Sequence, residues 1–293
     1  MPNTLDGLYA QAAEATHAGS RTFFFATRFF PPELARAAHA VYWFGGYTRG
    51  LGRQAASSEQ GMLDLNNWAA QVHKGLRGQL VHNPVLEVFL DAVERYKIPH
   101  SLALDLIESA RMDLSRTRYQ SFDQLREYCY RSSGTMSVLM AHLIGYRGPA
   151  LDYMADLGLA MELTAILRTV GTSLQRGHIY LPVEEIDAFG YSEAELQQRQ
   201  RNSAFRTMMG FQAERIRTYY QRSAPGLALL DARGRFAVRV AYDLSVRTLA
   251  CIEASDFDVF ERGPELPAME RYWITARSLA LPVTKRLWRS MSA

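Results

Sequence analysis

Apolar residues recur along this chain at spacings of three and four, and alternation with a period of two is nearly absent. Spacings of three and four place side chains on one face of an α-helix. The pattern is clearest in the stretches 34–48, 85–96, 102–110, 122–146, 150–175, 203–222 and 233–255. It predicts an all-α protein with eight or more helices.

Proline and glycine interrupt the helical pattern at six places. They are Pro31-Pro32, Asn83-Pro84, Pro99, Gly148-Pro149, Pro182 and Gly263-Pro264. None of these short breaks has the composition of a linker between domains, so we expect one domain over residues 1–293. Four glycines lie inside one helical stretch, at positions 45, 46, 50 and 52. Each costs a helix about 1 kcal/mol relative to alanine, so we expect that helix to fray or break near residue 45.

The composition is that of a folded protein without a nucleic-acid partner. Apolar residues make up 48% of the chain, and 33 Lys and Arg against 30 Asp and Glu give a formal charge of only +3. Two cysteines are too few for a disulfide framework, which favours a reducing compartment. The longest apolar stretch, Met136 to Ile144, is far shorter than the roughly 20 residues of a membrane span. The N-terminus does not have the pattern of a signal peptide. We expect a soluble, cytoplasmic protein, for which peripheral contact with a membrane stays open.

Common metal and phosphate motifs are missing from the sequence. The seven histidines include no His-x-x-x-His pair, so the sequence does not indicate a zinc site. It contains no glycine-rich phosphate loop and no Gly-x-Ser-x-Gly motif. The candidate chemistry therefore depends on longer motifs.

Five such motifs follow one another between residues 19 and 262. They are Ser20-Arg21-Thr22-Phe23-Phe24, Arg111-Met112-Asp113-Leu114, Tyr128-Cys129-Tyr130-Arg131-Ser132-Ser133-Gly134-Thr135, the pair Leu163–Arg168 and Gln175–Pro182, and Asp256-Phe257-Asp258-Val259-Phe260. Their order resembles that of the squalene/phytoene synthases, the head-to-head prenyl synthases. The resemblance implies the all-α isoprenoid synthase bundle, with a central cavity between its helices.

The resemblance also implies two aspartate-rich stretches that bind Mg²⁺, a hard cation that prefers oxygen ligands and bridges the protein to a diphosphate. The first should follow Tyr42, where this chain has Arg49-Gly50-Leu51-Gly52-Arg53. The second should place two aspartates and a glutamate at the positions of Thr169, Ser173 and Thr172. No carboxylate is present at any of these positions. We therefore expect no metal site and no other cofactor.

Helix spacing indicates what replaces those carboxylates. Tyr42, Arg49 and Arg53 share one helical face, and Glu162, Thr169 and Ser173 share another. Two guanidinium groups on the first face can contact an anion directly, with forked hydrogen-bond donors in place of a metal. The alternative is that both arginines are solvated surface charges.

Arg168 and Arg176 match basic residues that, by the resemblance, hold the diphosphate. Their alternatives are an ion pair with Asp156 or Glu185, or simple exposure. The resemblance further implies that Thr169 lies in the substrate site.

Ser20, Thr22 and Phe23 match the entrance of the resembled site, which contacts the diphosphate. Ser20 has the alternative role of a helix N-cap. Tyr42 and Tyr242 match cavity positions, although aromatic residues at helical spacing also fit a core.

Tyr128 matches a tyrosine that the resemblance places near the carbocation chemistry, and it is one catalytic candidate. Tyr128, Thr135 and Leu139 fall on one predicted helical stripe that would line the cavity. The alternative for Tyr128 is a core tyrosine with a satisfied hydroxyl.

Glu162 is the other catalytic candidate, because it is the carboxylate that remains on the second face. In a cavity its pKa would be raised and it could act as a base. The alternative is an ion pair with Arg49 or Arg168.

Two functions remain open at this point. The first is a non-standard transferase that takes a prenyl diphosphate, or another activated anionic substrate with a hydrophobic tail, and works without the Mg²⁺ cluster. The second is a catalytically inactive relative that serves as a lipid-binding or assembly factor. Both make a small molecule the expected partner.

Overall fold

Helices provide all the regular structure in the part of the chain that the computed structural model describes, residues 4–261 and 263–280. Within these residues the only β-type pairings are two isolated bridges, between Arg118 and Ile179 and between Tyr146 and Leu230. No described helix is both long and apolar enough to cross a membrane. The predicted all-α class is confirmed.

The helices are α1 (Leu5–Gly19), α2 (Arg21–Thr27), α3 (Pro32–Arg53), α4 (Ser58–Leu76), α5 (Pro84–Tyr96), α6 (Ser101–Ser115), α7 (Phe122–Cys129), α8 (Thr135–Ile144), α9 (Ala150–Arg168), α10 (Val170–Gln175), α11 (Val183–Ala188), α12 (Glu193–Gln197), α13 (Ser203–Ser223), α14 (Ala232–Ala254) and α15 (Ala268–Ala280). A π turn (Tyr130–Gly134) joins α7 to α8, and a 3₁₀ segment (Ala224–Leu229) precedes α14.

Polar side chains and prolines begin several of these helices. Ser57, Asn83, Ser121 and Asn202 each accept a hydrogen bond from a backbone N–H in the first turn. Pro32 and Pro84 are the first residues of α3 and α5, where a missing backbone N–H costs nothing. The predicted breaks at Pro31-Pro32 and Asn83-Pro84 are therefore the places where α3 and α5 begin.

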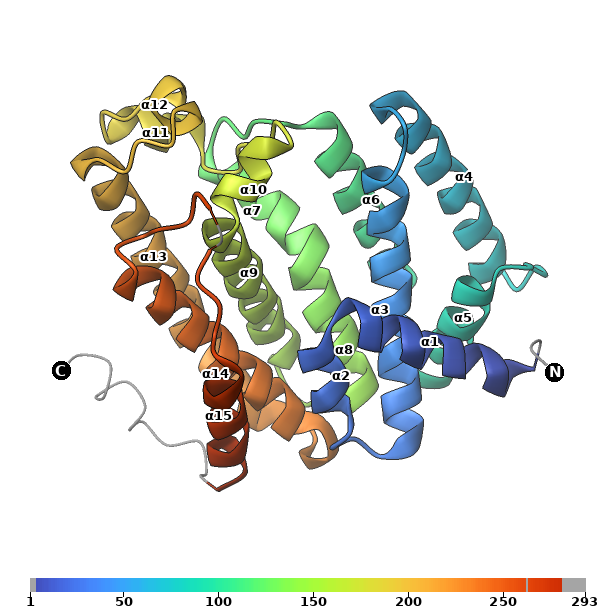
Figure 1. The fold of residues 1–293 in the computed structure, drawn as a ribbon. Helices are drawn as coiled ribbons and strands as arrows, with labels where there is room; N and C mark the ends of the chain where they lie inside the picture. The colour runs from blue at the N-terminus through green and yellow to red at the C-terminus, as the bar shows by residue number, and fades with distance from the viewer. Residues whose placement is uncertain (1–3, 262, 281–293) are drawn as a thin grey trace.

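The helices α3, α8 and α9 run through the middle of the molecule, with α4, α5 and α6 on one side and α13 and α14 on the other (Figure 1). One large hydrophobic core extends across both sides. Phe44 of α3 stacks on Phe89 of α5 with ring centroids 3.8 Å apart, and the Trp68 indole N–H donates to the Thr48 hydroxyl at 2.9 Å. These contacts fix α3 against α4 and α5.

The predicted break near residue 45 is wrong, because α3 continues from Pro32 to Arg53. Two of its glycines are sites of close packing. A Cβ at Gly45 would overlap the end of the Met136 side chain, and one at Gly52 would lie 3.2 Å from Leu114 Cγ. Close contact with α8 and α6 therefore offsets the low helix propensity of glycine.

The predicted continuous helix over 122–146 is interrupted by the π turn. At this turn α9 comes so near that a Cβ at Gly158 would overlap the Ser133 carbonyl. A π turn adds a residue to the helical repeat, so the side chains that follow it are rotated relative to those before it. Tyr128 and Leu139 are therefore not on one stripe.

The second predicted stripe is also interrupted, because α9 ends at Arg168 and α10 begins at Val170. The backbone near Phe260 packs against this point: the Gly171 N–H donates to the Val259 carbonyl at 3.1 Å, and a Cβ at Gly171 would overlap the Phe260 carbonyl. After the break Thr172 is exposed and Ser173 is buried.

Candidate functional site

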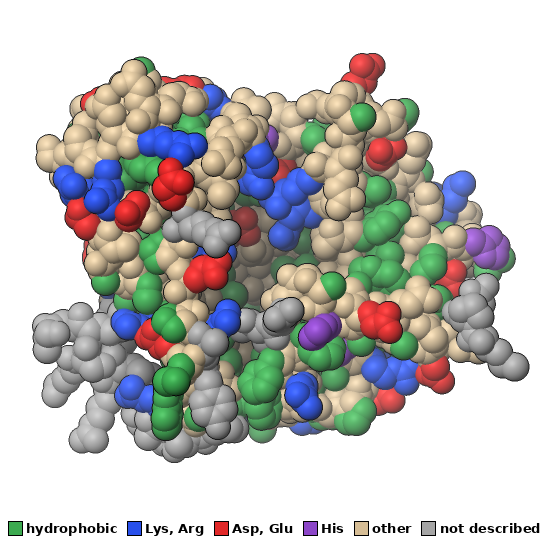
Figure 2. Space-filling model, in the orientation of Figure 1, with side chains coloured by type: hydrophobic (Ala, Val, Ile, Leu, Met, Phe, Trp, Pro, Cys, Tyr) green, Lys and Arg blue, Asp and Glu red, His purple; other side chains and the backbone are tan. Residues whose placement is uncertain are grey.

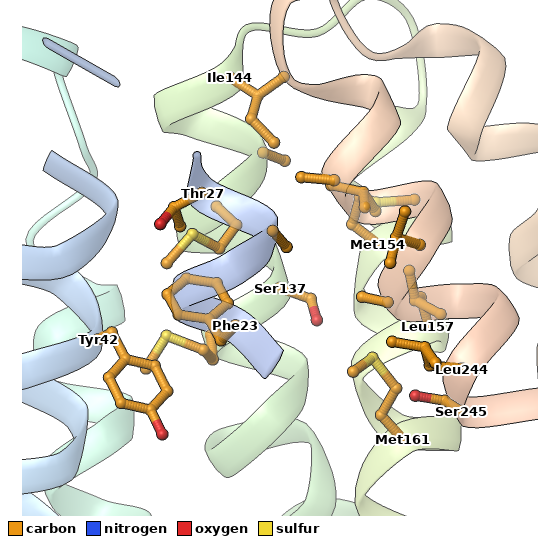
Figure 3. Close-up of a pocket in the computed structure, with 18 of the residues that line it drawn as sticks. Phe23, Thr27, Tyr42, Ser137, Ile144, Met154, Leu157, Met161, Leu244 and Ser245 are labelled. Atoms are coloured by element: carbon orange, nitrogen blue, oxygen red, sulfur yellow. The ribbon is translucent and has the colours of Figure 1, made fainter. Parts of the chain in front are cut away.

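An apolar cavity of about 320 Å³ lies between α2, α3, α8, α9 and α14 (Figure 3). It is at the lower end of the volumes typical of small-molecule sites. Most of its lining is aliphatic or aromatic, and it includes Phe23, Phe30, Tyr42, Met136, Met140, Ile144, Met154, Leu157, Met161, Val240 and Leu244. The cavity suits a hydrocarbon chain.

Polar groups enter the cavity at a few points. Ser20, Thr27, Ser137 and Ser245 contribute to its lining. The Ser20 hydroxyl accepts from the Phe23 N–H at 3.2 Å, so Ser20 caps α2 and lines the cavity as well. The two interpretations of Ser20 are thus compatible.

Tyr42 and Phe23 form one side of the cavity, stacked with ring centroids 4.8 Å apart. Met161 and Ser245 lie across from them, and Ile144 lies at the far end (Figure 3). Thr22 belongs to α2, but its side chain lies outside the described part of the structure.

Two of the helices that line the cavity, α3 and α9, carry an arginine beyond its lining residues. Arg49 lies seven residues beyond Tyr42 on α3, and Arg168 lies seven residues beyond Met161 on α9, a rise of about 10 Å in each case. The two helices run in the same direction (Figure 1), so both arginines lie beyond the same end of the cavity. Arg49 is exposed and Arg168 is partly buried, and neither makes an ion pair with a described residue. On the face shown in Figure 2, basic side chains gather at the rim of a central hollow.

Arg53 is held by a buried cluster that sequence spacing did not predict. Its Nε donates to Asp113 Oδ2 at 3.2 Å, and the hydroxyls of Tyr128 and Tyr180 both donate to Asp113 Oδ1, the first at 3.2 Å. The Asp113 side chain is only 10% exposed. Asp113 and Tyr180 both lie in sequence motifs, and this was the sign in the sequence that they could belong to the site. That the two residues meet depends on the fold.

The environment of this cluster keeps its tyrosines neutral. Burial raises the pKa of Tyr128 well above its ordinary value, and the nearby carboxylates of Glu162 and Asp113 raise it further. Burial and Asp113 likewise raise the pKa of Tyr180. Tyr128 is therefore a hydrogen-bond donor at neutral pH, and its hydroxyl is satisfied as the core interpretation expected.

Positive charge also gathers around His178. Burial lowers the pKa of His178, Asp113 opposes that effect, and the charges of Arg176 and Arg53 lower the pKa further. These two arginines, from the end of α10 and the end of α3, thus act on the same region. Arg176 is exposed and pairs with no described carboxylate.

The proposed ion pairs of Glu162, Arg168 and Arg176 are absent among the described residues. Glu162 accepts a hydrogen bond from the Ser133 hydroxyl instead. The acidic partners suggested for the arginines are taken, because Asp156 pairs with Arg222 at 3.1 Å and Glu185 pairs with Arg215.

Four other candidates lie outside the lining of the apolar cavity. Thr135 and Leu139 are buried in the core because the π turn rotates them away, and Met136, Ser137 and Met140 line the cavity in their place. The Tyr242 hydroxyl donates to the Tyr220 carbonyl at 3.2 Å inside the core. The Thr169 hydroxyl bonds the Ala165 carbonyl at 2.7 Å, where α9 ends.

Comparison with known proteins shows to which family this chain belongs. The sequence profile of the squalene/phytoene synthases matches residues 16–270. The chain belongs to the squalene/phytoene synthase family. It is 30% identical to a phytoene synthase of Arthrospira platensis, over 92% of each chain, and 30% identical to a 15-cis-phytoene synthase of Synechocystis sp., over 94% of this chain and 87% of that one.

Solved structures agree on the fold. A dehydrosqualene synthase in complex with a ligand superposes with a TM-score of 0.87 at 21% identity, covering 94% of this chain and 96% of that one. The squalene synthase HpnC from Alicyclobacillus acidocaldarius gives 0.82 at 19% identity, covering 89% and 98%. The predicted isoprenoid synthase-type bundle is confirmed.

The residues at the expected metal positions of this squalene/phytoene synthase relative do not fit Mg²⁺. Within the described residues no three His, Cys, Asp or Glu side chains gather as a metal site requires. Glu162 and Asp113 are engaged within the protein, Glu162 with Ser133 and Asp113 with Arg53 and two tyrosines. The side chains that could meet an anion here are arginines.

Proposed function

We propose that this chain binds a prenyl diphosphate, or another activated anionic substrate with a hydrophobic tail, and transfers its hydrocarbon group without the Mg²⁺ cluster. Membership in the squalene/phytoene synthase family and relatives named phytoene synthases support the prenyl substrate. The chain would be a transferase whose donor site uses guanidinium groups.

One observation supports the proposal most strongly: two helices that line the apolar cavity, α3 and α9, each carry an arginine beyond the same end of it. The hydrocarbon tail would lie between Tyr42 and Met161 and extend toward Ile144. The diphosphate would then meet Arg49 and Arg168, which have no described carboxylate partner. Burial of the tail and pairing of the head group would each favour the same orientation.

The chemistry needs positive charge where the leaving group departs. When the C–O bond to the diphosphate breaks, its electron pair goes to the diphosphate oxygen, and guanidinium groups stabilise that developing charge. Tyr128 would contribute a neutral hydroxyl dipole near the cation rather than a base, because its pKa is raised. The aliphatic lining would keep water from the hydrocarbon cation.

Calorimetry with a prenyl thio-diphosphate tests the donor site. Wild type should bind equally well in EDTA and in Mg²⁺. Arg168→Ala and Arg49→Ala should each weaken binding by about 1.5–3 kcal/mol, the range for hydrogen bonds to charged groups. Arg77→Ala is the matched control, since Arg77 is an exposed arginine at the end of α4.

Two results would overturn the proposal. One is binding that requires Mg²⁺ and is lost in Glu162→Gln, which would make Glu162 a metal ligand. The other is equal binding by wild type and both arginine variants, with circular dichroism showing that all are folded. Binding without release of pyrophosphate from any prenyl diphosphate would favour the inactive, lipid-binding alternative.

A further inference from the structure

Exposed aromatic side chains lie on three neighbouring segments of the chain. Phe25 of α2 is 40% exposed, Phe29 just beyond α2 is 38% exposed, and Trp273 of α15 is 64% exposed. The two phenylalanine rings meet edge to face with centroids 5.5 Å apart, and Phe29 meets Phe236 of α14 in the same way at 4.7 Å. Phe236 and Ile274 of α15 pack against one hydrophobic cluster, which joins the three segments.

The exposed residues of α15 extend this apolar area. Met269, which is 73% exposed, precedes Trp273 by four residues and lies along the same side of the helix. The end of α15, the start of α14 and α2 lie together on the lower side of the molecule in Figure 1, and hydrophobic side chains reach that edge in Figure 2. The following residues are here called the aromatic surface: Phe25, Phe29, Phe236, Met269 and Trp273. An exposed apolar area of this kind marks a binding surface.

Positive charge accompanies the aromatic surface. Arg28 lies between the two exposed phenylalanines, and Arg277 lies four residues beyond Trp273; both arginines are exposed. From Arg271 to Ala293 the sequence contains four arginines and one lysine, and no aspartate or glutamate. Part of this basic sequence, residues 281–293, lies outside the described residues and contains a further tryptophan. The complementary partner is therefore negatively charged as well as apolar.

The apolar cavity lies directly behind the aromatic surface. Ala26 and Phe30 line the cavity, whereas Phe25 and Phe29, which alternate with them along the chain, are exposed on the outside. Ile144, at the far end of the cavity, ends α8 on the same lower side of the molecule (Figure 1). A short stretch of chain thus separates a cavity suited to hydrocarbon from an exposed apolar surface.

We propose that the aromatic surface binds a lipid bilayer that carries anionic head groups. Aromatic rings are favoured at the level of the head groups, where one side of the ring meets acyl chains. Arg28, Arg277 and the basic residues beyond α15 would contact the lipid phosphates, and each such contact adds to the affinity. An acidic protein would satisfy the charges, but a bilayer also takes up the rings along the whole area.

The orientation has a consequence that rests on the proposed function. Arg49 and Arg168 lie beyond the end of the cavity opposite to Ile144, so the diphosphate would leave toward water. The tail end of the cavity would face the lipid. A hydrocarbon product would then lie next to the phase in which it dissolves.

Flotation of the purified full chain with lipid vesicles tests the proposal without any substrate. Vesicles of phosphatidylcholine and phosphatidylglycerol should bind the protein, and vesicles of phosphatidylcholine alone should bind it about tenfold more weakly because they lack anionic head groups. Salt should weaken binding to the anionic vesicles, because it screens exposed charges.

One pair of variants tests the rings. Phe25→Ser combined with Trp273→Ser should weaken binding to anionic vesicles by about tenfold or more, because two exposed aromatic side chains are lost. Leu63→Ser combined with Leu80→Ser is the matched control. These leucines are 53% and 84% exposed, in α4 and just after it, on the other side of the molecule, so this variant should bind as wild type does.

A second pair of variants tests the charges and leaves the aromatic surface intact. Lys285→Ala combined with Arg286→Ala should weaken binding about fivefold for each charge removed, because a basic residue near an anionic bilayer contributes about 1 kcal/mol. Lys74→Ala combined with Arg77→Ala removes two exposed charges at the end of α4 and should have no effect. Circular dichroism shows that each variant is folded.

Several outcomes would overturn the proposal. They are no flotation with anionic vesicles, equal binding to neutral and anionic vesicles, or equal losses in a variant and its matched control. Wild type that ignores vesicles and forms a dimer, which Phe25→Ser with Trp273→Ser converts to a monomer, would make the aromatic surface a contact between two copies. Failure of the proposed function alone is distinguishable, because a protein that binds no prenyl thio-diphosphate would still float with anionic vesicles.

Discussion

At the residue scale, Asp113 organises the basic end of the site. It is one-tenth exposed and accepts hydrogen bonds from Arg53, Tyr128 and Tyr180. A buried carboxylate is stable only when such partners replace its water. Asp113 thereby fixes both the orientation of Arg53 and the position of the Tyr128 hydroxyl.

Replacing Asp113 by Asn should lower the free energy of unfolding by about 1.5–3 kcal/mol. The amide keeps one acceptor oxygen, but its NH₂ group would face hydrogen-bond donors, and Arg53 would lose its counter-charge. Urea unfolding followed by circular dichroism measures the change.

Asp123→Asn is the matched control. Asp123 pairs with Arg126 at 3.2 Å on the surface and is 83% exposed, so its loss should cost less than about 1 kcal/mol. Equal costs for the two variants would contradict the role assigned to Asp113.

Sequence reasoning found some of these residues and missed others for a physical reason. Ser20, Phe23 and Tyr42 line the cavity, and Arg49 lies seven residues beyond Tyr42 on α3. The contact between Arg53 and Asp113 joins positions 60 residues apart, which no helical period relates.

At the element scale, glycines decide how closely the central helices approach. The π turn occurs where Gly158 of α9 packs against the Ser133 carbonyl. The break after Arg168 occurs where Gly171 of α10 packs against the Phe260 carbonyl. Hydrophobic periodicity predicts which side chains of a helix face the core. It does not predict contacts between a glycine and the backbone of another segment. The helices were therefore predictable and their two interruptions were not.

Gly158→Ala should be strongly destabilising. Its methyl group would overlap the Ser133 carbonyl, and backbone cannot move aside as a flexible side chain can. We expect a loss of about 1–3 kcal/mol, the usual cost of overpacking.

Gly46→Ala should have the opposite effect. No atom outside the helix lies within 4 Å of a Cβ at Gly46, so alanine should stabilise α3 by roughly 0.5–1 kcal/mol. Thermal unfolding of both variants shows the signs directly. A Gly158→Ala protein as stable as wild type would mean that α9 does not pack against the π turn in this way.

At the scale of the whole molecule, one buried and two half-buried histidines couple folding to pH. Burial lowers the pKa of His39, His142 and His178 in the folded protein. The unfolded chain, with ordinary histidine pKa values near 6.5, therefore binds protons first as the pH falls. Their contribution to stability is present above about pH 6.5 and is lost as the pH falls below it.

The midpoint of thermal unfolding should fall as the pH is lowered from 7.5 to 5.5, and His39→Gln should reduce that fall. His39 is buried, with its Nε2 2.7 Å from the Thr27 hydroxyl, and glutamine can keep that hydrogen bond without titrating. His73→Gln, at an exposed histidine on α4, should leave the pH dependence unchanged. A slope in His39→Gln as steep as in wild type would show that His39 is not responsible.

The central arrangement of the molecule is an apolar cavity with Arg49 and Arg168 about two helical turns beyond Tyr42 and Met161, where the family resemblance implies Mg²⁺ ligands. A crystal structure with a prenyl thio-diphosphate, grown in the presence of Mg²⁺, tests it most directly. We predict the hydrocarbon tail between Tyr42 and Met161, the diphosphate in contact with Arg49 and Arg168, and no metal ion bridging it to the protein. Metal ions between the diphosphate and protein carboxylates, or a tail outside the apolar cavity, would contradict the account.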